Sequence, residues 1–76
     1  MAEHLYKVIE LVGTSADSWE KAAASAVEEA AKHLQDIRIA EVTEMDMHIV
    51  EGKVAAYRTK VKVSFKYHPE KHKQMP

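Results

Sequence analysis

Apolar residues occupy both alternate sets of positions in the first segment of the chain, His4–Val12, where only Lys7 and Glu10 interrupt them. Alternation with apolar groups in both sets predicts a strand that is largely covered on both of its faces. The segment Gly13-Thr14-Ser15 follows, and its small, turn-favouring residues predict that the strand ends there.

A helical period begins after this segment. Its apolar residues recur at spacings of three and four: Trp19, Ala23, Ala26, Val27, Ala30, Ala31 and Leu34. This spacing predicts an amphipathic helix that runs to about Gln35. Asp17 or Ser18 is the expected N-cap, and if Asp17 caps the helix, Glu20 falls in the position of a capping box.

The rest of the chain predicts a β-hairpin. Residues 37–50 and 53–67 show no helical period and are rich in β-branched and aromatic side chains, which are typical of strands. Between them, Glu51-Gly52 predicts a two-residue turn that sets Val50 opposite Lys53. In that register Val42 lies opposite Val61, on an apolar side that must face the helix.

The other side of the predicted hairpin is mixed and charged. The cross-strand pairs expected there are Ile39 with Ser64, Glu41 with Lys62, Thr43 with Lys60, and Met45 with Arg58. A slip of one residue would mix this side with the apolar one, which supports the register. Since one helix covers only one face of a sheet, the charged side is expected to stay bare unless other chains cover it.

The predicted fold class is therefore α+β, with the order strand, helix, strand, strand. One helix packs on one face of a three-stranded antiparallel sheet. We expect a single domain over residues 1–76, with a core at about 4–67 and a flexible polar tail at 68–76. So short a chain buries little apolar surface, which favours a homo-oligomer.

Charge is distributed unevenly along the chain. Residues 1–52 carry eleven acidic and four basic side chains, whereas residues 53–76 carry one acidic and seven basic. Opposite halves of a short chain usually pair within the fold or its oligomer. The cations between Arg58 and Lys66 fall on the side of their strand away from its aromatic residues. Binders of single-stranded nucleic acid need both on one surface, so no nucleic-acid partner is expected.

No catalytic motif is present. The sequence has no cysteine, no Gly-x-Ser-x-Gly, no glycine-rich phosphate loop and no His-Glu-x-x-His, which predicts a protein that is not an enzyme and has no catalytic residues. The five histidines are scattered, and no metal ligands are assigned. Glu44, Asp46 and Glu51 could meet a calcium ion, but they lack the twelve-residue loop pattern and are read as a solvated strand end.

The segment before residue 5 and the remainder of the chain contain no long apolar run. We therefore expect no signal peptide, no membrane partner and a cytoplasmic location. Trp19 could be a ring on which a ligand stacks, but its place on the apolar stripe of the helix favours a packing role.

Several stretches of the sequence together resemble the dodecin family. They are Tyr6–Ser15, then Ser18-Trp19-Glu20 opening an alanine-rich helix, then Ile37–Val42 and Ala56–Phe65. The likeness covers roughly residues 5–67. It implies a strand–helix–strand–strand subunit that assembles into a hollow homododecamer. It also implies flavins bound as stacked pairs between subunits, stored or buffered rather than used in redox turnover.

The resemblance also places a ligand pocket. Ile39 stands where the family stacks the flavin ring on a tryptophan, and Arg58 stands where a glutamine hydrogen-bonds the polar edge of the flavin. Glu41 and Met45 are the other expected pocket positions. Ile39 offers no π-face, and the fixed charge of Arg58 suits a phosphate, a carboxylate or Glu41.

The function that these observations predict is a dodecin-type shell that binds or stores a small ligand of the flavin class, riboflavin or flavin mononucleotide. Ile39 and Arg58 are expected to weaken that binding. The chain is similar to a subgroup of dodecins with a calcium-binding member. The alternative is therefore a shell without flavin that binds calcium or a phosphate-bearing ligand such as coenzyme A, or one that is purely structural, with Arg58 paired to acidic groups.

Overall fold

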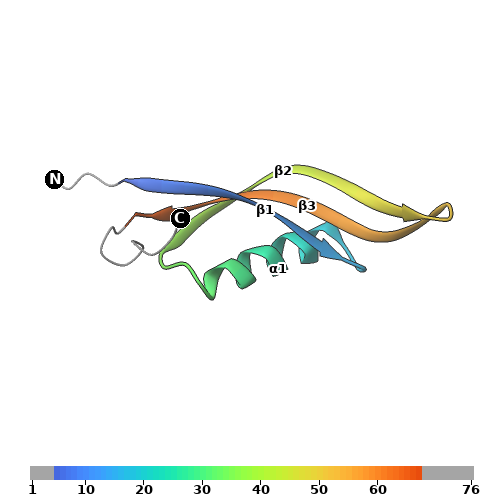
Figure 1. The fold of residues 1–76 in the computed structure, drawn as a ribbon, viewed down its shortest axis with the longest axis horizontal. Coiled ribbons are helices and arrows are strands. Elements are labelled where there is room, and N and C mark those ends of the chain that lie inside the picture. Colours follow the sequence, from blue (N-terminus) through green and yellow to red (C-terminus); the bar gives the residue numbers. More distant parts are fainter. Residues whose placement is uncertain (1–4, 68–76) are drawn as a thin grey trace.

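One helix lies under a three-stranded antiparallel sheet in the computed structural model, which describes residues 5–67 (Figure 1). The elements are β1 (Tyr6–Ser15), α1 (Trp19–Ala31), β2 (Ile37–Val50) and β3 (Lys53–Lys66). The order across the sheet is β1-β3-β2, so the last strand is central. The predicted fold class and order of elements are confirmed.

β1 is longer than predicted because Gly13 does not end it. Gly13 is buried within β1 and pairs with Thr59 of β3. The backbone of α1 crosses directly over it, and a Cβ at Gly13 would overlap the carbonyl oxygen of Ala22. A glycine inside a strand often marks such a close approach of another backbone. His4, the predicted first residue of the strand, lies outside the described residues.

Ser18 is the N-cap of α1. Its hydroxyl accepts a hydrogen bond from the backbone N–H of Lys21 at 3.0 Å. Lys21 therefore holds the third helical position, and the capping box that Asp17 and Glu20 would form is absent. Asp17 instead forms an ion pair with Lys21, whose Nζ lies 3.1 Å from its carboxylate.

The helix ends at Ala31 rather than near Gln35. Leu34, which continues the helical period, is buried in the connection that follows, so it contributes to the core without being helical. Asp36 then adopts a left-handed backbone conformation with φ 62°, from which the chain turns into β2.

The hairpin turn is as predicted. Val50 pairs with Lys53, and both turn residues have positive φ, 50° at Glu51 and 76° at Gly52. This is the backbone of the two-residue turn whose twist matches that of paired strands. Figure 1 shows the tip of this hairpin extending well past the start of α1.

The core lies between α1 and the β1–β3 half of the sheet. Its buried residues are Ala22, Leu34, Thr59, Val61, Val63 and Phe65. The described chain measures 53 × 25 × 16 Å, with a radius of gyration of 14.8 Å. A compact domain of this length has a radius of about 11 Å. The subunit is therefore elongated and has a small core.

Much apolar surface is left open. The prediction that both faces of β1 are covered is wrong for the single chain, since Val8 and Val12 on the face away from α1 are 56% and 51% exposed. Exposed apolar side chains also follow β2 and the hairpin tip: Val42, Met45, Met47, Ile49, Val50 and Val54. Patches of this extent are typical of surfaces that other chains cover.

We therefore expect native mass spectrometry at micromolar concentration to show a homo-oligomer with little free subunit, and the resemblance to the dodecins implies about twelve chains. The reason is that the exposed apolar surface of each chain can be removed from water only by further copies. Monomers or dimers alone at that concentration would contradict this prediction.

Candidate ligand-binding face

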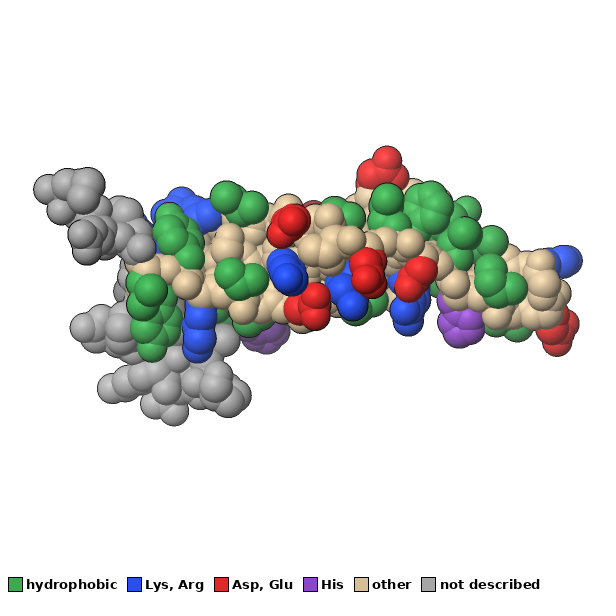
Figure 2. Space-filling model, turned by 90° about the horizontal axis from the view of Figure 1, so that it is seen from above, with side chains coloured by type: hydrophobic (Ala, Val, Ile, Leu, Met, Phe, Trp, Pro, Cys, Tyr) green, Lys and Arg blue, Asp and Glu red, His purple; other side chains and the backbone are tan. Residues whose placement is uncertain are grey.

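The face of the sheet opposite α1 carries a column of cations on β3 beside a column of anions on β2. Its paired rows, written β3 to β2, are Lys62 with Glu41, Lys60 with Glu44, and Arg58 with Asp46. On the other side of β3, Glu10 of β1 also lies opposite Lys62. Figure 2 shows acidic and basic side chains intermingled along the middle of this face, with apolar groups towards its ends. We call this surface the ligand face.

Asp46 and Arg58 form the best-defined contact on the ligand face. Arg58 Nε donates to Asp46 Oδ1 at 2.7 Å, and Nη2 donates to Oδ2 at 3.0 Å. This hydrogen bonding by Arg58 holds the pKa of the Asp46 carboxyl below its ordinary value, and the same contact raises the pKa of Arg58. Two parallel bonds between a guanidinium and a carboxylate fix orientation as well as charge.

Two irregularities in the β2–β3 pairing bring Asp46 opposite Arg58. The register shifts by one residue between Val42 and Glu44 and shifts back between His48 and Ile49. A shift of one residue exchanges the two faces of a strand. The predicted pairs of Met45 with Arg58 and Thr43 with Lys60 are therefore wrong. The predicted pairs that precede this stretch in β2, Ile39 with Ser64 and Glu41 with Lys62, are confirmed.

Thr43 is the extra residue at the irregularity between Val42 and Glu44. Its hydroxyl donates to the backbone oxygen of Lys60 at 3.2 Å, which ties the bulged strand to its partner. Beyond it, Lys60 Nζ lies 3.4 Å from a carboxylate oxygen of Glu44. The bulge thus sets an acidic side chain beside Lys60 and another beside Arg58. In a regular ladder both acidic side chains would point to the opposite face of the sheet.

Met45 lies on the helix side of the sheet, not on the ligand face. It pairs with the buried Thr59 and lines a shallow pocket of about 460 Å³ next to the start of α1. The expected site of four residues is therefore divided, with Ile39, Glu41 and Arg58 on one face and Met45 on the other.

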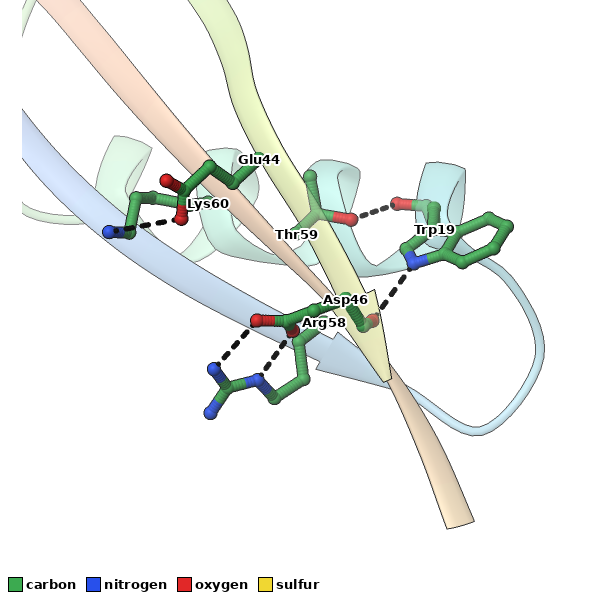
Figure 3. A network of polar contacts seen from close by, with 6 residues as sticks. All are labelled: Trp19, Glu44, Asp46, Arg58, Thr59 and Lys60. Carbon is green, nitrogen blue, oxygen red and sulfur yellow. Dashed lines mark hydrogen bonds and ion pairs between the residues drawn. The ribbon is translucent and has the colours of Figure 1, made fainter. Parts of the chain in front are cut away.

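Trp19 connects the start of α1 to the strand that carries Asp46. Its indole N–H donates to the backbone oxygen of Asp46 at 3.0 Å, and its own carbonyl accepts from the hydroxyl of Thr59 at 2.9 Å (Figure 3). Its ring meets that of Tyr57 edge-on, with centroids 5.0 Å apart. Trp19 therefore packs within the fold, as its place in the helical period predicted.

Ile39 and Arg58 lie far apart along the ligand face. Ile39 is 64% exposed and pairs with Ser64, which is six residues from Arg58 along β3. At about 3.3 Å per residue this is roughly 20 Å, more than one flavin ring system spans. A flavin ring system that meets both an Ile39 and an Arg58 would therefore take them from two subunits.

Other polar groups do not gather into a site. Of the acidic trio Glu44, Asp46 and Glu51, the first two pair with cations. Residues 5–67 contain no group of three acidic, histidine or cysteine side chains arranged to hold a metal ion. His33 lies 4.0 Å from Glu29. His68 and His72 lie outside the described residues.

A groove of about 660 Å³ runs between α1 and β1. Its walls are mainly apolar, including Ile9, Leu11 and Ala26, with Glu29 and His33 at one end.

Over residues 5–67, the fold offers no helix with the length and apolar character of a membrane span.

Comparison with known proteins places this fold. The sequence model of the Dodecin family matches residues 5–68. Calcium dodecin of Mycobacterium tuberculosis (strain ATCC 25618 / H37Rv) is 49% identical over 65 residues, which are 86% of this chain and 92% of that protein. Its crystal structure, described as having a calcium-binding site, superposes with a TM-score of 0.78 over 86% of this chain and 93% of its own. Dodecin from Streptomyces coelicolor superposes with a TM-score of 0.84 at 35% identity, over 90% and 97% of the two chains. The chain therefore belongs to the dodecin family.

Proposed function

We propose that this protein is a non-enzymatic shell of the dodecin type that binds a small ligand between subunits on the ligand face, and that it holds flavin weakly. The observation that carries the proposal is the state of Arg58. At the position where the family presents an amide to the flavin edge, this chain has a guanidinium already held by Asp46 at 2.7 and 3.0 Å. A flavin edge would have to compete with that ion pair.

Ile39 adds a second loss. It can cover a flat ring by dispersion but cannot stack, and stacking contributes about 0.5–1.5 kcal/mol beyond the buried area. A pair of flavins meeting two such positions would lose one or two orders of magnitude in affinity, at about 1.4 kcal/mol per tenfold. Its exposure of 64% in the single chain leaves it available to a ligand or a neighbouring subunit.

The double variant Ile39→Trp, Arg58→Gln is expected to bind riboflavin at least tenfold more tightly than the natural protein. The tryptophan restores a ring on which the flavin stacks, and the glutamine restores an uncharged donor and acceptor at its edge. Quenching of flavin fluorescence during titration of the assembled protein measures both dissociation constants.

Ile39→Leu, Arg58→Gln is the matched control, because it changes the same two positions without adding a ring. It is expected to recover less than half of the gain in binding free energy. Tight riboflavin binding by the natural protein would contradict the proposal, as would an unchanged dissociation constant in the tryptophan variant.

Calcium is the second candidate ligand, because a relative 49% identical over 65 residues is named for calcium. Within one described chain, Glu44 and Asp46 are paired with cations, whereas Glu10 and Glu41 share Lys62 as cross-strand neighbour. A calcium site on this face would therefore need carboxylates from more than one subunit. Equilibrium dialysis against calcium, with magnesium as the competing ion, tests this candidate independently of flavin.

A further inference from the structure

We propose that Asp46 is the specificity-determining residue of the ligand face: it acts as an internal counter-ion that occupies Arg58 and excludes ligands carrying a phosphate group. The inference rests on the proposed function and assigns the ligand class that the site would accept without this carboxylate. Guanidinium groups bind carboxylates and phosphates in the same planar, two-pronged way, so Asp46 and a phosphate compete for one set of donors.

The fold holds Asp46 in this competing position from both sides. Its carboxylate takes Arg58 Nε and Nη2, while its backbone oxygen accepts the indole N–H of Trp19 at 3.0 Å. Figure 3 shows these contacts converging on Asp46 from α1 and β3. Because the backbone is tied to the helix start, the carboxylate stays opposite Arg58.

The shifted register makes the arrangement specific to Asp46. In an unbroken ladder Met45 would face Arg58, and the guanidinium would have no acidic cross-strand partner. The bulge at Thr43 turns Asp46 to the ligand face instead. The neighbouring pair, Lys60 with Glu44, is looser, with one contact at 3.4 Å. Glu44 lies on the same strand and the same face as Asp46 and carries the same charge, but it does not hold its cation through two hydrogen bonds.

The test compares flavin mononucleotide with riboflavin, which differ only in the phosphate. It uses the assembled Ile39→Trp protein, in which the added ring is expected to raise the flavin affinity into the measurable range. Adding Asp46→Asn is expected to raise the preference for flavin mononucleotide over riboflavin at least tenfold, since the guanidinium becomes free for the phosphate. Asp46→Ser, a shorter neutral replacement, is expected to give the same direction of change.

Glu44→Gln in the same background is the matched control, because it removes an identical charge from the same face. We expect its preference to change less than threefold, which separates release of Arg58 from a general loss of negative charge. Adding Arg58→Gln to the Asp46→Asn protein is expected to abolish the gain.

An equal shift in the Asp46→Asn and Glu44→Gln proteins would overturn the proposal, and so would an unchanged preference in a protein that binds both flavins. Failure of the Ile39→Trp, Arg58→Gln protein to bind riboflavin more tightly than the natural chain would overturn the proposed function, whereas the two results above overturn this inference alone.

Discussion

Gly13→Ala is expected to destabilise the subunit by at least about 3 kcal/mol, at or above the upper end of the usual cost of overpacking. The new Cβ would overlap the carbonyl oxygen of Ala22 and lie 3.0 Å from the Cβ of Ala26. Neither neighbour is the end of a flexible side chain, and Ala22 is fully buried. The helix would have to move off β1, which opens the small core.

Gly52→Ala is the control for this prediction, because at Gly52 a Cβ has space but the backbone conformation is unfavourable. A Cβ at Gly52 would meet nothing within 4 Å, but its φ of 76° disfavours a side chain. The expected cost is about 1–2 kcal/mol, from backbone conformation alone. Urea unfolding followed by circular dichroism at one fixed protein concentration measures both variants. An equal loss of unfolding free energy in the two variants would show that α1 does not pack against Gly13 as closely as described.

The order of elements and most of the fold could be predicted because the local patterns agree with one another. The period of two, the period near 3.6, and the Glu51-Gly52 dipeptide each predict an element that the structure contains. The exact end of the helix could not be predicted in this way. Leu34 keeps the helical period because it is buried, and burial alone does not require it to be helical.

A glycine after an apolar run is typical of a turn, so the local sequence predicts that the strand ends at Gly13. Its actual role depends on where α1 crosses the sheet, which no local pattern reports. The backbone of Ala22, nine positions further along the chain, can approach this closely only because residue 13 has no Cβ. Tertiary contact therefore decided between two readings that are equally compatible with the local sequence.

The candidate site was predicted in part for a similar reason. Ile39, Glu41 and Arg58 lie on the face that the predicted hairpin register gives them, whereas Met45 does not. Thr43 is β-branched and fits a regular strand as well as a bulge, so the sequence gives no reason to insert a shift there. The one available clue was charge: a shift of one residue sets Asp46 against Arg58 and Glu44 against Lys60, which a regular ladder does not.

Trp19→Ala is expected to destabilise the subunit by about 3 kcal/mol, the low end of the range for removing a large aromatic side chain from a core. The low end is appropriate because Trp19 is only half-buried in the single chain. The loss combines the edge-on contact with Tyr57 at 5.0 Å and the hydrogen bond to Asp46 at 3.0 Å. α1 contacts β2 less than it contacts β1 or β3, so Trp19 supplies much of the contact between α1 and β2.

Trp19→Phe separates the two parts of that loss, and Ser18→Ala is a control for the start of the helix. Trp19→Phe keeps a ring beside Tyr57 but removes the indole N–H, so it is expected to cost about 1 kcal/mol for the hydrogen bond. Ser18→Ala removes only the cap of α1 and is also expected to cost about 1 kcal/mol. Urea unfolding at a fixed concentration ranks the three, with native mass spectrometry to follow assembly. If Trp19→Ala left both stability and assembly unchanged, the ring would have to be reassigned from packing to an exposed platform for a ligand.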